Sequence, residues 1–302
     1  MADFRARLDT LSPAARGHLA MLAFSMLVAG SFSMGGMVAN DIAPAALNAV
    51  RFLMAALLVG LIGLASGTVR RGDRRAPWRY LILGALFATY FVTMFEGLKT
   101  APPVSTAAMF TLTPVMSAGF GWLLLRQVTS RFMGVALAIG AAGAIWVIFR
   151  ADIEALLAFQ IGRGEAIFFW GVVAHAIYPV AVRGLNRGEH PIGMTFGMLV
   201  AGTLVLFLYG AGDLAATDWG GLPVMVWVVI GYTSVFAGAA TFTLLPYAAM
   251  RLPSAKVMAY TYLVPSWVIL WELALGNGAP RALVLAGVVL TIVSLVMLLK
   301  ER

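Results

Sequence analysis

A histidine and several tyrosines are the residues of this chain best suited to binding a polar ligand within apolar surroundings. His175 is the only ionisable residue midway along the apolar stretch 164–182, and Gly171, His175 and Tyr178 follow one another at i, i+4 and i+7. This spacing places the three residues on one face of a helix. Ionisable groups in such apolar surroundings are costly and usually functional, so this face is a candidate binding surface. The alternative is a histidine that only hydrogen-bonds a neighbouring helix.

Further side chains in other apolar stretches are candidates to contact the same ligand, through aromatic rings, hydroxyls, a thioether or freed backbone. They are Ser31, Phe87, Tyr90, Met94, Phe110, Thr111, Thr113, Tyr232, Phe236, Tyr260 and Thr261. Tyrosines at mid-depth carry the most weight, because a hydroxyl there needs a hydrogen-bond partner. We therefore expect Tyr90, Tyr178 and Tyr260 to touch the ligand.

Two prolines interrupt long apolar stretches near their centres, in the segments MFTLTPVM and YTYLVPSW. Pro114 lacks an N–H and so frees the carbonyl of Phe110, four residues earlier. Pro265 frees the carbonyl of Thr261 in the same way. An unpaired carbonyl cannot face lipid, so these breaks predict a central cavity, with Pro114 and Pro265 as hinges. The alternative is a pair of ordinary kinks that improve packing.

A third proline lies close to the candidate histidine. Pro179 removes the helical hydrogen bond to the carbonyl of His175, and we predict a hinge there as well. The hydroxyls of Thr111, Thr113 and Thr261 are placed to satisfy part of the interrupted backbone.

The composition places the chain in a membrane. Of its 302 residues, 61% are hydrophobic and only 11% are charged, against about 25% charged residues in soluble domains. The absence of Cys excludes disulfides, thiol catalysis and thiolate metal sites. The HExxH, GxSxG and Walker motifs are missing too, so we expect no metal, no cofactor and no enzymatic activity.

The apolar stretches predict an all-α integral membrane protein, since a spanning helix needs about 20 apolar residues. Ten spans are predicted: His18–Met37, Ala43–Ser66, Trp78–Leu98, Ser105–Leu125, Phe132–Phe149, Gly164–Val182, Ile192–Tyr209, Val224–Tyr247, Pro253–Trp271 and Ala282–Leu299.

Lysine and arginine in the connecting loops predict the orientation. With the N-terminus in the cytoplasm, 16 of the 21 basic residues fall on the cytoplasmic side, and the outer loops keep Lys99, Arg150, Arg163 and Arg281. Both termini are therefore expected inside. The basic charge then reflects topology and contact with membrane lipid, and we expect no nucleic-acid partner.

The proline pattern predicts two repeats. Pro102 and Pro114 lie twelve positions apart, and so do Pro253 and Pro265. We expect a cytoplasmic tail (1–17), a first five-helix repeat (18–150), an external linker (151–163) and a second five-helix repeat (164–302). Because five is odd, the second repeat is expected to cross the membrane inverted relative to the first, an arrangement that suits a transporter.

Arg51, about a third of the way into the second span, is costly there unless it is paired or reaches the surface. We expect a structural role, in which it caps a neighbouring helix; binding an anionic group is the alternative. We expect the chain to act as a monomer.

Several segments resemble the drug/metabolite transporter superfamily, EamA type. They are GLKTAPPVSTAAMFTLTPVMSAGFGWLLL (97–125), its echo AAMRLPSAKVMAYTYLVPSWVILWELALG (248–276), FWG (169–171) and Arg51 within ALNAVRFLMAALL. The family often has Gly-Glu after the fourth helix of each repeat, where this chain has Leu125-Arg126 and Gly276-Asn277. Within the superfamily the chain looks most similar to YddG-type exporters of aromatic and neutral amino acids. The resemblance implies a central cavity lined by both halves and export across a bacterial inner membrane.

These patterns together predict an alternating-access carrier for a small amphipathic metabolite. A nucleotide-sugar, sugar-phosphate or drug exchanger of the same superfamily is the main alternative. A channel, a membrane scaffold and a lipid-modifying enzyme are the others.

Overall fold

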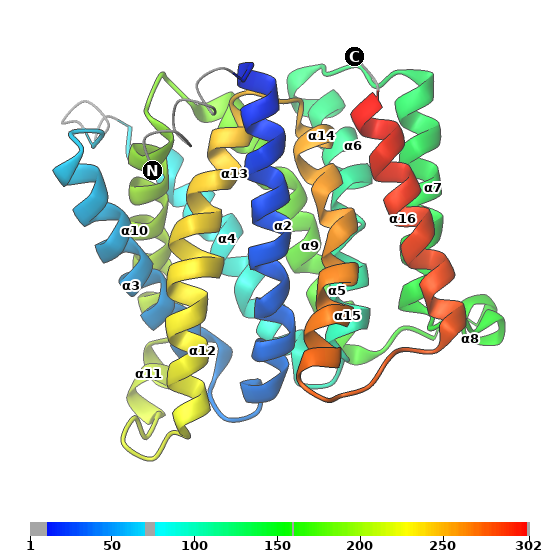
Figure 1. The fold of residues 1–302 in the computed structure, drawn as a ribbon. Helices are drawn as coiled ribbons and strands as arrows, with labels where there is room; N and C mark the ends of the chain where they lie inside the picture. The colour runs from blue at the N-terminus through cyan, green and yellow to red at the C-terminus, as the bar shows by residue number, and fades with distance from the viewer. Residues whose placement is uncertain (1–10, 70–75, 159, 301–302) are drawn as a thin grey trace.

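Ten apolar helical spans lie side by side in the computed structural model, which describes residues 11–69, 76–158 and 160–300 (Figure 1). Seven are single helices: α2 (Pro13–Val38), α3 (Pro44–Ala65), α4 (Trp78–Leu98), α7 (Arg131–Ile148), α9 (Arg163–Leu185), α10 (Pro191–Tyr209) and α16 (Ala282–Lys300). No strand occurs in the described ranges. The all-helical fold and the ten predicted spans are confirmed, to within a few residues at their ends.

The other three spans are interrupted. The fourth consists of α5 (Pro103–Phe110) and α6 (Thr113–Leu125), the eighth of α12 (Val224–Ser234), the π-helical turn η2 (Val235–Ala240) and α13 (Thr241–Ala249), and the ninth of α14 (Ser254–Ala259), the 3₁₀ turn η3 (Tyr260–Leu263) and α15 (Val264–Ala274). The breaks in the fourth and ninth spans were predicted, and the π-helical turn was not. Two short loop helices, α8 (Ile153–Leu157) and α11 (Ala211–Ala216), were not predicted either.

Prolines mark where many of the helices begin. Pro13, Pro44, Pro103 and Pro191 are each the first residue of their helix, where a missing N–H costs nothing and the fixed φ favours helical geometry. The first span begins earlier than predicted, because the side chain of Ser12 accepts a hydrogen bond from the N–H of Ala15 and so caps the helix.

The same pairs of neighbouring spans occur in both halves of the chain when the first to fifth spans are matched with the sixth to tenth. α4 packs on α9 as α13 packs on α2, and α6 packs on α9 as α15 packs on α2. α7 and α16, which exchange with each other, form a pair, and so do α3 and α10. This pattern is expected of two five-helix repeats. The domain boundaries and the inverted orientation of the second repeat stay predictions.

The charges separate between the two ends of the bundle. α2 begins and α16 ends at the same end, which we call the basic end (top in Figure 1). Basic residues at or near this end are Arg16, Arg79, Arg126, Arg131, Arg183, Arg187, Arg251, Lys256 and Lys300. The other end, which we call the acidic end, carries Asp41, Glu96, Asp152, Glu154, Glu165, Asp213, Asp218 and Glu272, together with fewer basic residues: Lys99, Arg150, Arg163 and Arg281. Residues 1–10, the basic run 70–75 and Arg302 lie outside the described residues. That the basic end faces the cytoplasm stays a prediction.

Glycine allows α4 and α10 to approach closely. A Cβ at Gly84 would lie 2.5 Å from the backbone nitrogen of Gly202 and 2.8 Å from the carbonyl oxygen of Met198. Both are backbone atoms of the facing helix and cannot rotate away. By contrast, a Cβ at Gly134 in α7 would meet no atom within 4 Å.

We predict that Gly84→Ala destabilises the protein by about 1–3 kcal/mol through overpacking. Gly134→Ala is the matched control, and it is expected to be neutral or stabilising because alanine favours the helix. Thermal unfolding of the purified variants in detergent measures both effects. Equal stability of the two variants would contradict the close α4–α10 packing.

A buried ion pair ties the start of α4 to the loop between α9 and α10. Arg79 Nη2 lies 2.6 Å from Glu189 Oε1, and Arg79 Nη1 donates a 2.7 Å hydrogen bond to the carbonyl of Leu185. Burial on its own would raise the pKa of Glu189. The hydrogen bonds from the Arg79 side chain and the Arg187 backbone N–H outweigh burial and lower that pKa below its usual value of about 4.5.

A lowered carboxyl pKa predicts a loss of stability in acid. The ion pair stabilises the fold at neutral pH, and this contribution is expected to disappear as the pH falls below about 4.5. Glu189→Gln should remove this part of the pH dependence, whereas Glu154→Gln, at an exposed position, should keep it. Melting temperatures between pH 7 and pH 3.5 test this. Parallel curves for wild type and Glu189→Gln would rule out the contribution.

Candidate functional site

The two predicted helix breaks meet inside the bundle. Thr113 Oγ1, at the start of α6, lies 3.0 Å from Thr261 Oγ1 in η3, and both residues are fully buried. The hydroxyl of Thr113 also donates to the carbonyl of Phe110 at 2.7 Å, and the N–H of Val264 donates to the carbonyl of Thr261. Both carbonyls freed by proline are therefore hydrogen-bonded. The prediction that they are free to bind a ligand is wrong in this conformation.

Five of the predicted site residues surround one point next to these breaks. The ring of His175 in α9 lies 4.4 Å from Tyr90 and 4.7 Å from Phe110, measured between ring centroids. Phe87 lies 5.5 Å from His175 and 4.1 Å from Tyr178. We call these five residues from α4, α5 and α9 the aromatic cluster.

The aromatic cluster is closed to water. His175 and Phe87 are each 1% exposed, and Tyr90, Phe110 and Tyr178 are not exposed at all. Almost no surface of these five side chains is therefore accessible to water. Their rings fill the centre, where the sequence predicts a cavity. The predicted central cavity is closed in this conformation.

Three polar atoms of the cluster lack a hydrogen-bond partner within the described part of the chain. They are Nδ1 of His175 and the hydroxyls of Tyr90 and Tyr178. A buried polar atom without a partner costs about 1–3 kcal/mol, and native structures hold few of them. Three of the eleven such atoms in the described residues belong to this one cluster, which makes the cluster the candidate site for a ligand.

Four other predicted residues pack within or between helices near the cluster. Gly171 lies against Thr93 and the backbone of Tyr90, so it allows α9 to approach α4 and has no room to face a ligand. Ser31 and Thr111 donate to carbonyls of their own helices, and Met94 is fully buried in the core. The prediction that Gly171 lines the cavity is wrong here, because a neighbouring helix occupies that face.

Three predicted aromatic residues lie away from the cluster. The hydroxyl of Tyr232 donates to the carbonyl of Leu27 at 2.8 Å, and the neighbouring Phe236 is 48% exposed. Tyr260 packs beside His18, with ring centroids 6.0 Å apart. The structure therefore does not bring Tyr232, Phe236 and Tyr260 to His175, since α12, η2 and η3 turn these rings elsewhere.

Sequence reasoning missed several rings that extend the aromatic cluster. Phe24, Phe168 and Phe242 each lie within 6.3 Å of one of its members, and Phe91 packs 4.6 Å from Tyr90. Only Phe242 has a signal in the sequence: Pro246, four residues later, frees its carbonyl. That carbonyl accepts a 2.7 Å hydrogen bond from the hydroxyl of Thr195.

Near Pro179, too, a side chain of another helix donates a hydrogen bond to a backbone carbonyl. It leaves the carbonyl of His175 without its helical donor, and the next carbonyl, of Ala176, accepts a 2.6 Å hydrogen bond from Ser117 in α6. The three predicted hinge prolines therefore lie where α6, α9 and α15 depend on side-chain hydrogen bonds or short turns. Their movement stays a prediction.

Arg51 is buried between the second and eighth spans. Its guanidinium lies 3.9 Å from the centre of the Phe91 ring and donates to the carbonyls of Ala237 (3.0 Å) and Thr233 (3.3 Å) and to Asn48 Oδ1 (3.3 Å). The π-helical turn η2 disturbs the backbone bonding of this region, and Arg51 bonds to carbonyls within and just before it. This geometry is a helix-capping one.

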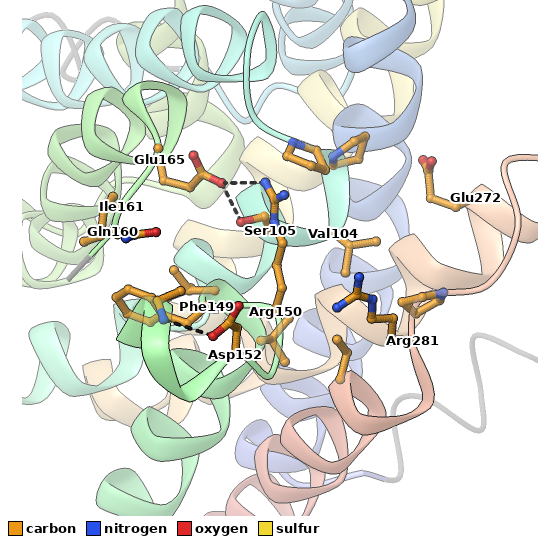
Figure 2. A pocket seen from close by; sticks show the side chains of 18 of the residues that line it. Val104, Ser105, Phe149, Arg150, Asp152, Gln160, Ile161, Glu165, Glu272 and Arg281 are labelled. Carbon is orange, nitrogen blue, oxygen red and sulfur yellow. Dashed lines mark hydrogen bonds and ion pairs between the residues drawn. The ribbon is translucent and has the colours of Figure 1, made fainter. Parts of the chain in front are cut away.

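A second polar region forms a pocket at the acidic end, which we call the outer pocket (Figure 2). It has a volume of about 690 Å³ and lies between the ends of α5, α7, α9 and α15 and the loop before α16. Glu165 Oε1 accepts a 2.7 Å hydrogen bond from Ser105 and lies 3.9 Å from a guanidinium nitrogen of Arg150. Glu272 and Arg281 line another wall of the pocket.

The sequence comparison with known families is decisive. The profile of the EamA-like transporter family matches the chain twice, over residues 15–149 and 162–300. The chain belongs to the EamA-like transporter family. Like other members, it is a membrane transporter, and the two matches coincide with the two halves of five spans.

Individual relatives agree with this family. The EamA-family chain is 22% identical over 262 residues to an uncharacterized transporter, YyaM, of Bacillus subtilis (strain 168), which covers 86% of each chain. One solved crystal structure superposes with a TM-score of 0.72 and 18% identity, over 95% of this chain and 96% of the other. That likeness supports the fold alone.

No group of three His, Cys, Asp or Glu side chains is placed to hold a metal ion among the residues described. The EamA-family chain instead gathers rings and single hydrogen-bonding groups at its closed centre.

We predict that Arg51→Met lowers the stability of this EamA-family protein. The substitution leaves carbonyls near η2 unpaired at a depth where lipid offers no donor, at about 1–3 kcal/mol for each. Arg131→Met, at the exposed start of α7, is the control and should have little effect. Melting in detergent compares them, and an unchanged melting temperature for Arg51→Met would refute the capping role.

Proposed function

We propose that this protein is an alternating-access carrier for small amphipathic metabolites, and that it exports aromatic and neutral amino acids across a bacterial inner membrane. The observation that carries the proposal is the aromatic cluster with its three unpartnered polar atoms. The protein would act as a monomer with both termini in the cytoplasm. Family membership supports transport, and the substrate and direction are our inference.

The chemistry of the aromatic cluster favours an amino acid with a large apolar side chain. Rings from Phe87, Phe110 and Tyr90 can pack against an aromatic or thioether side chain in offset or edge-to-face geometry. The imidazole of His175 and the hydroxyl of Tyr178 can donate to a carboxylate or accept from an ammonium group. A ligand of this kind supplies the hydrogen bonds that these buried atoms lack.

A sugar nucleotide fits the same centre less well. Its phosphates would need several buried basic groups, because desolvated phosphate oxygens require charged donors. Arg51 is buried nearby, but its two terminal guanidinium nitrogens are already bonded to two carbonyls and an amide oxygen, which leaves only Nε without a partner among the described residues. The neutral polar atoms of the cluster suit a zwitterion better than a polyanion.

The closed centre and the broken helices support alternating access. A ligand can reach the aromatic cluster only if the rings separate, and α6 and α15 begin at the breaks where Thr113 and Thr261 meet. Tilting these half-helices about Pro114 and Pro265 would open the cluster toward one end or the other. Two inverted repeats that exchange conformations would turn one state into the other.

We predict that Tyr90→Phe separates transport from stability. Removing an unpaired buried hydroxyl should leave the melting temperature unchanged or raise it, while transport falls about tenfold or more because the ligand loses a hydrogen bond. His175→Ala should also lose transport. Tyr209→Phe, where the ring is 71% exposed, is the matched control and should transport like wild type.

The assay uses purified protein in liposomes. Labelled phenylalanine, methionine, threonine and a sugar nucleotide are compared with and without a pH gradient, and saturation distinguishes a carrier from a channel. Wild-type kinetics in both Tyr90→Phe and His175→Ala would refute the site. Transport of the sugar nucleotide alone would refute the proposed substrate class.

A further inference from the structure

The outer pocket holds a buried carboxylate that forms no ion pair within the described part of the chain. Glu272, near the end of α15, is only 9% exposed, and its Oε1 has no hydrogen-bond partner among the described residues. Its Oε2 accepts a 3.0 Å hydrogen bond from the side-chain amide of Asn277, a neutral group. A buried carboxylate with a free oxygen is costly, and an ammonium group is the partner that relieves this cost best.

The other walls of the outer pocket carry both signs of charge. Glu165 is buried and already bonded to Ser105, with the mostly exposed Arg150 at 3.9 Å (Figure 2). Arg281 is exposed and lines the pocket on the side of Glu272. The pocket wall therefore holds an unpartnered carboxylate oxygen that is itself enclosed, so a ligand reaches it only if the Glu272 side chain turns toward the cavity, and guanidinium groups lie nearer the solvent.

The outer pocket is connected to the aromatic cluster by two helices. α5 runs from Ser105 in the pocket to Phe110 in the cluster, and α9 runs from Glu165 to His175. Phe168, one turn below Glu165, lies 5.6 Å from Tyr90. A molecule in the outer pocket would thus lie beyond the aromatic rings that close the centre.

We propose that the outer pocket is a second binding site, for an α-amino acid zwitterion. The Glu272 side chain turns so that the ammonium group binds its Oε1, and the carboxylate faces Arg281 and Arg150. The side chain lies over Val104 and Phe149, which also line the pocket. The proposal rests on the proposed function in one respect: it names the ligand as the transported amino acid, held at the acidic end while the centre is closed.

Cysteine labelling tests the site without altering its charges. The chain has no Cys, so Ala279→Cys in the pocket wall gives one thiol for a membrane-impermeant maleimide. Phenylalanine and phenethylamine, which share an ammonium group, should slow labelling at least threefold. 3-Phenylpropionate, which lacks that group, should not. Ala216→Cys, in a different pocket at the same end, is the control and should label at one rate throughout.

The role of the carboxylate is tested in the Ala279→Cys background. Adding Glu272→Gln should weaken protection by phenethylamine about tenfold, the loss expected for one charge-assisted hydrogen bond. Adding Glu154→Gln, an exposed acid outside the pocket, should leave protection unchanged. Equal protection by 3-phenylpropionate and phenethylamine, or no protection by either, would overturn the proposal, whether or not Glu272→Gln folds.

Measuring both uptake and thiol protection with the Ala279→Cys protein distinguishes failure of this inference from failure of the proposed function. If liposomes take up phenylalanine while no amine protects Ala279→Cys, the carrier stands and the outer site falls. If amines protect the thiol while no amino acid is transported, the outer site stands and the proposed substrate falls.

Discussion

The bundle depends on one constraint: a backbone group released by a helix break must find another partner, because hydrocarbon offers none. Thr113 serves the carbonyl released at Pro114, and Thr195 serves the one released at Pro246. Arg51 serves the carbonyls around η2 from a different helix. Each substitute is a single side-chain hydrogen bond. The helices can therefore be interrupted at mid-depth without exposing unpaired backbone to lipid.

The same constraint gives the two threonine hydroxyls at the centre more than one possible acceptor. Thr113 Oγ1 and Thr261 Oγ1 are 3.0 Å apart, yet each also lies within hydrogen-bond distance of a carbonyl in the preceding helix of its own span. Since a hydroxyl carries one hydrogen, either threonine can donate to its carbonyl or to its counterpart. The two broken spans thus share hydroxyl groups that can exchange one hydrogen-bond acceptor for another.

The spans and the two proline breaks were predictable, because hydrophobic length and a missing N–H act locally. Which side chains lie at the centre could be predicted only in part. His175 and Tyr178 stood out as polar groups in an apolar helix, but Phe91 and Phe242 did not. In a membrane both faces of a helix are apolar, so hydrophobic periodicity does not show which rings turn inward. The turn η2 was hidden for another reason, because its carbonyls bond to Arg51, nearly two hundred residues earlier.

The two polar regions of the molecule differ in a way that follows from their depth. At the centre, the unpartnered atoms of the aromatic cluster belong to two phenols and an imidazole, and the buried guanidinium of Arg51 lies beyond Phe91. Toward the acidic end, where water approaches, the groups are carboxylates and guanidiniums. A zwitterion passing between them would exchange full charges for hydrogen bonds as it leaves water, and reverse the exchange on release. If the proposed site is correct, the five cluster residues would hold such a zwitterion through hydrogen bonds and ring contacts, with the nearest fixed charge on Arg51 beyond Phe91.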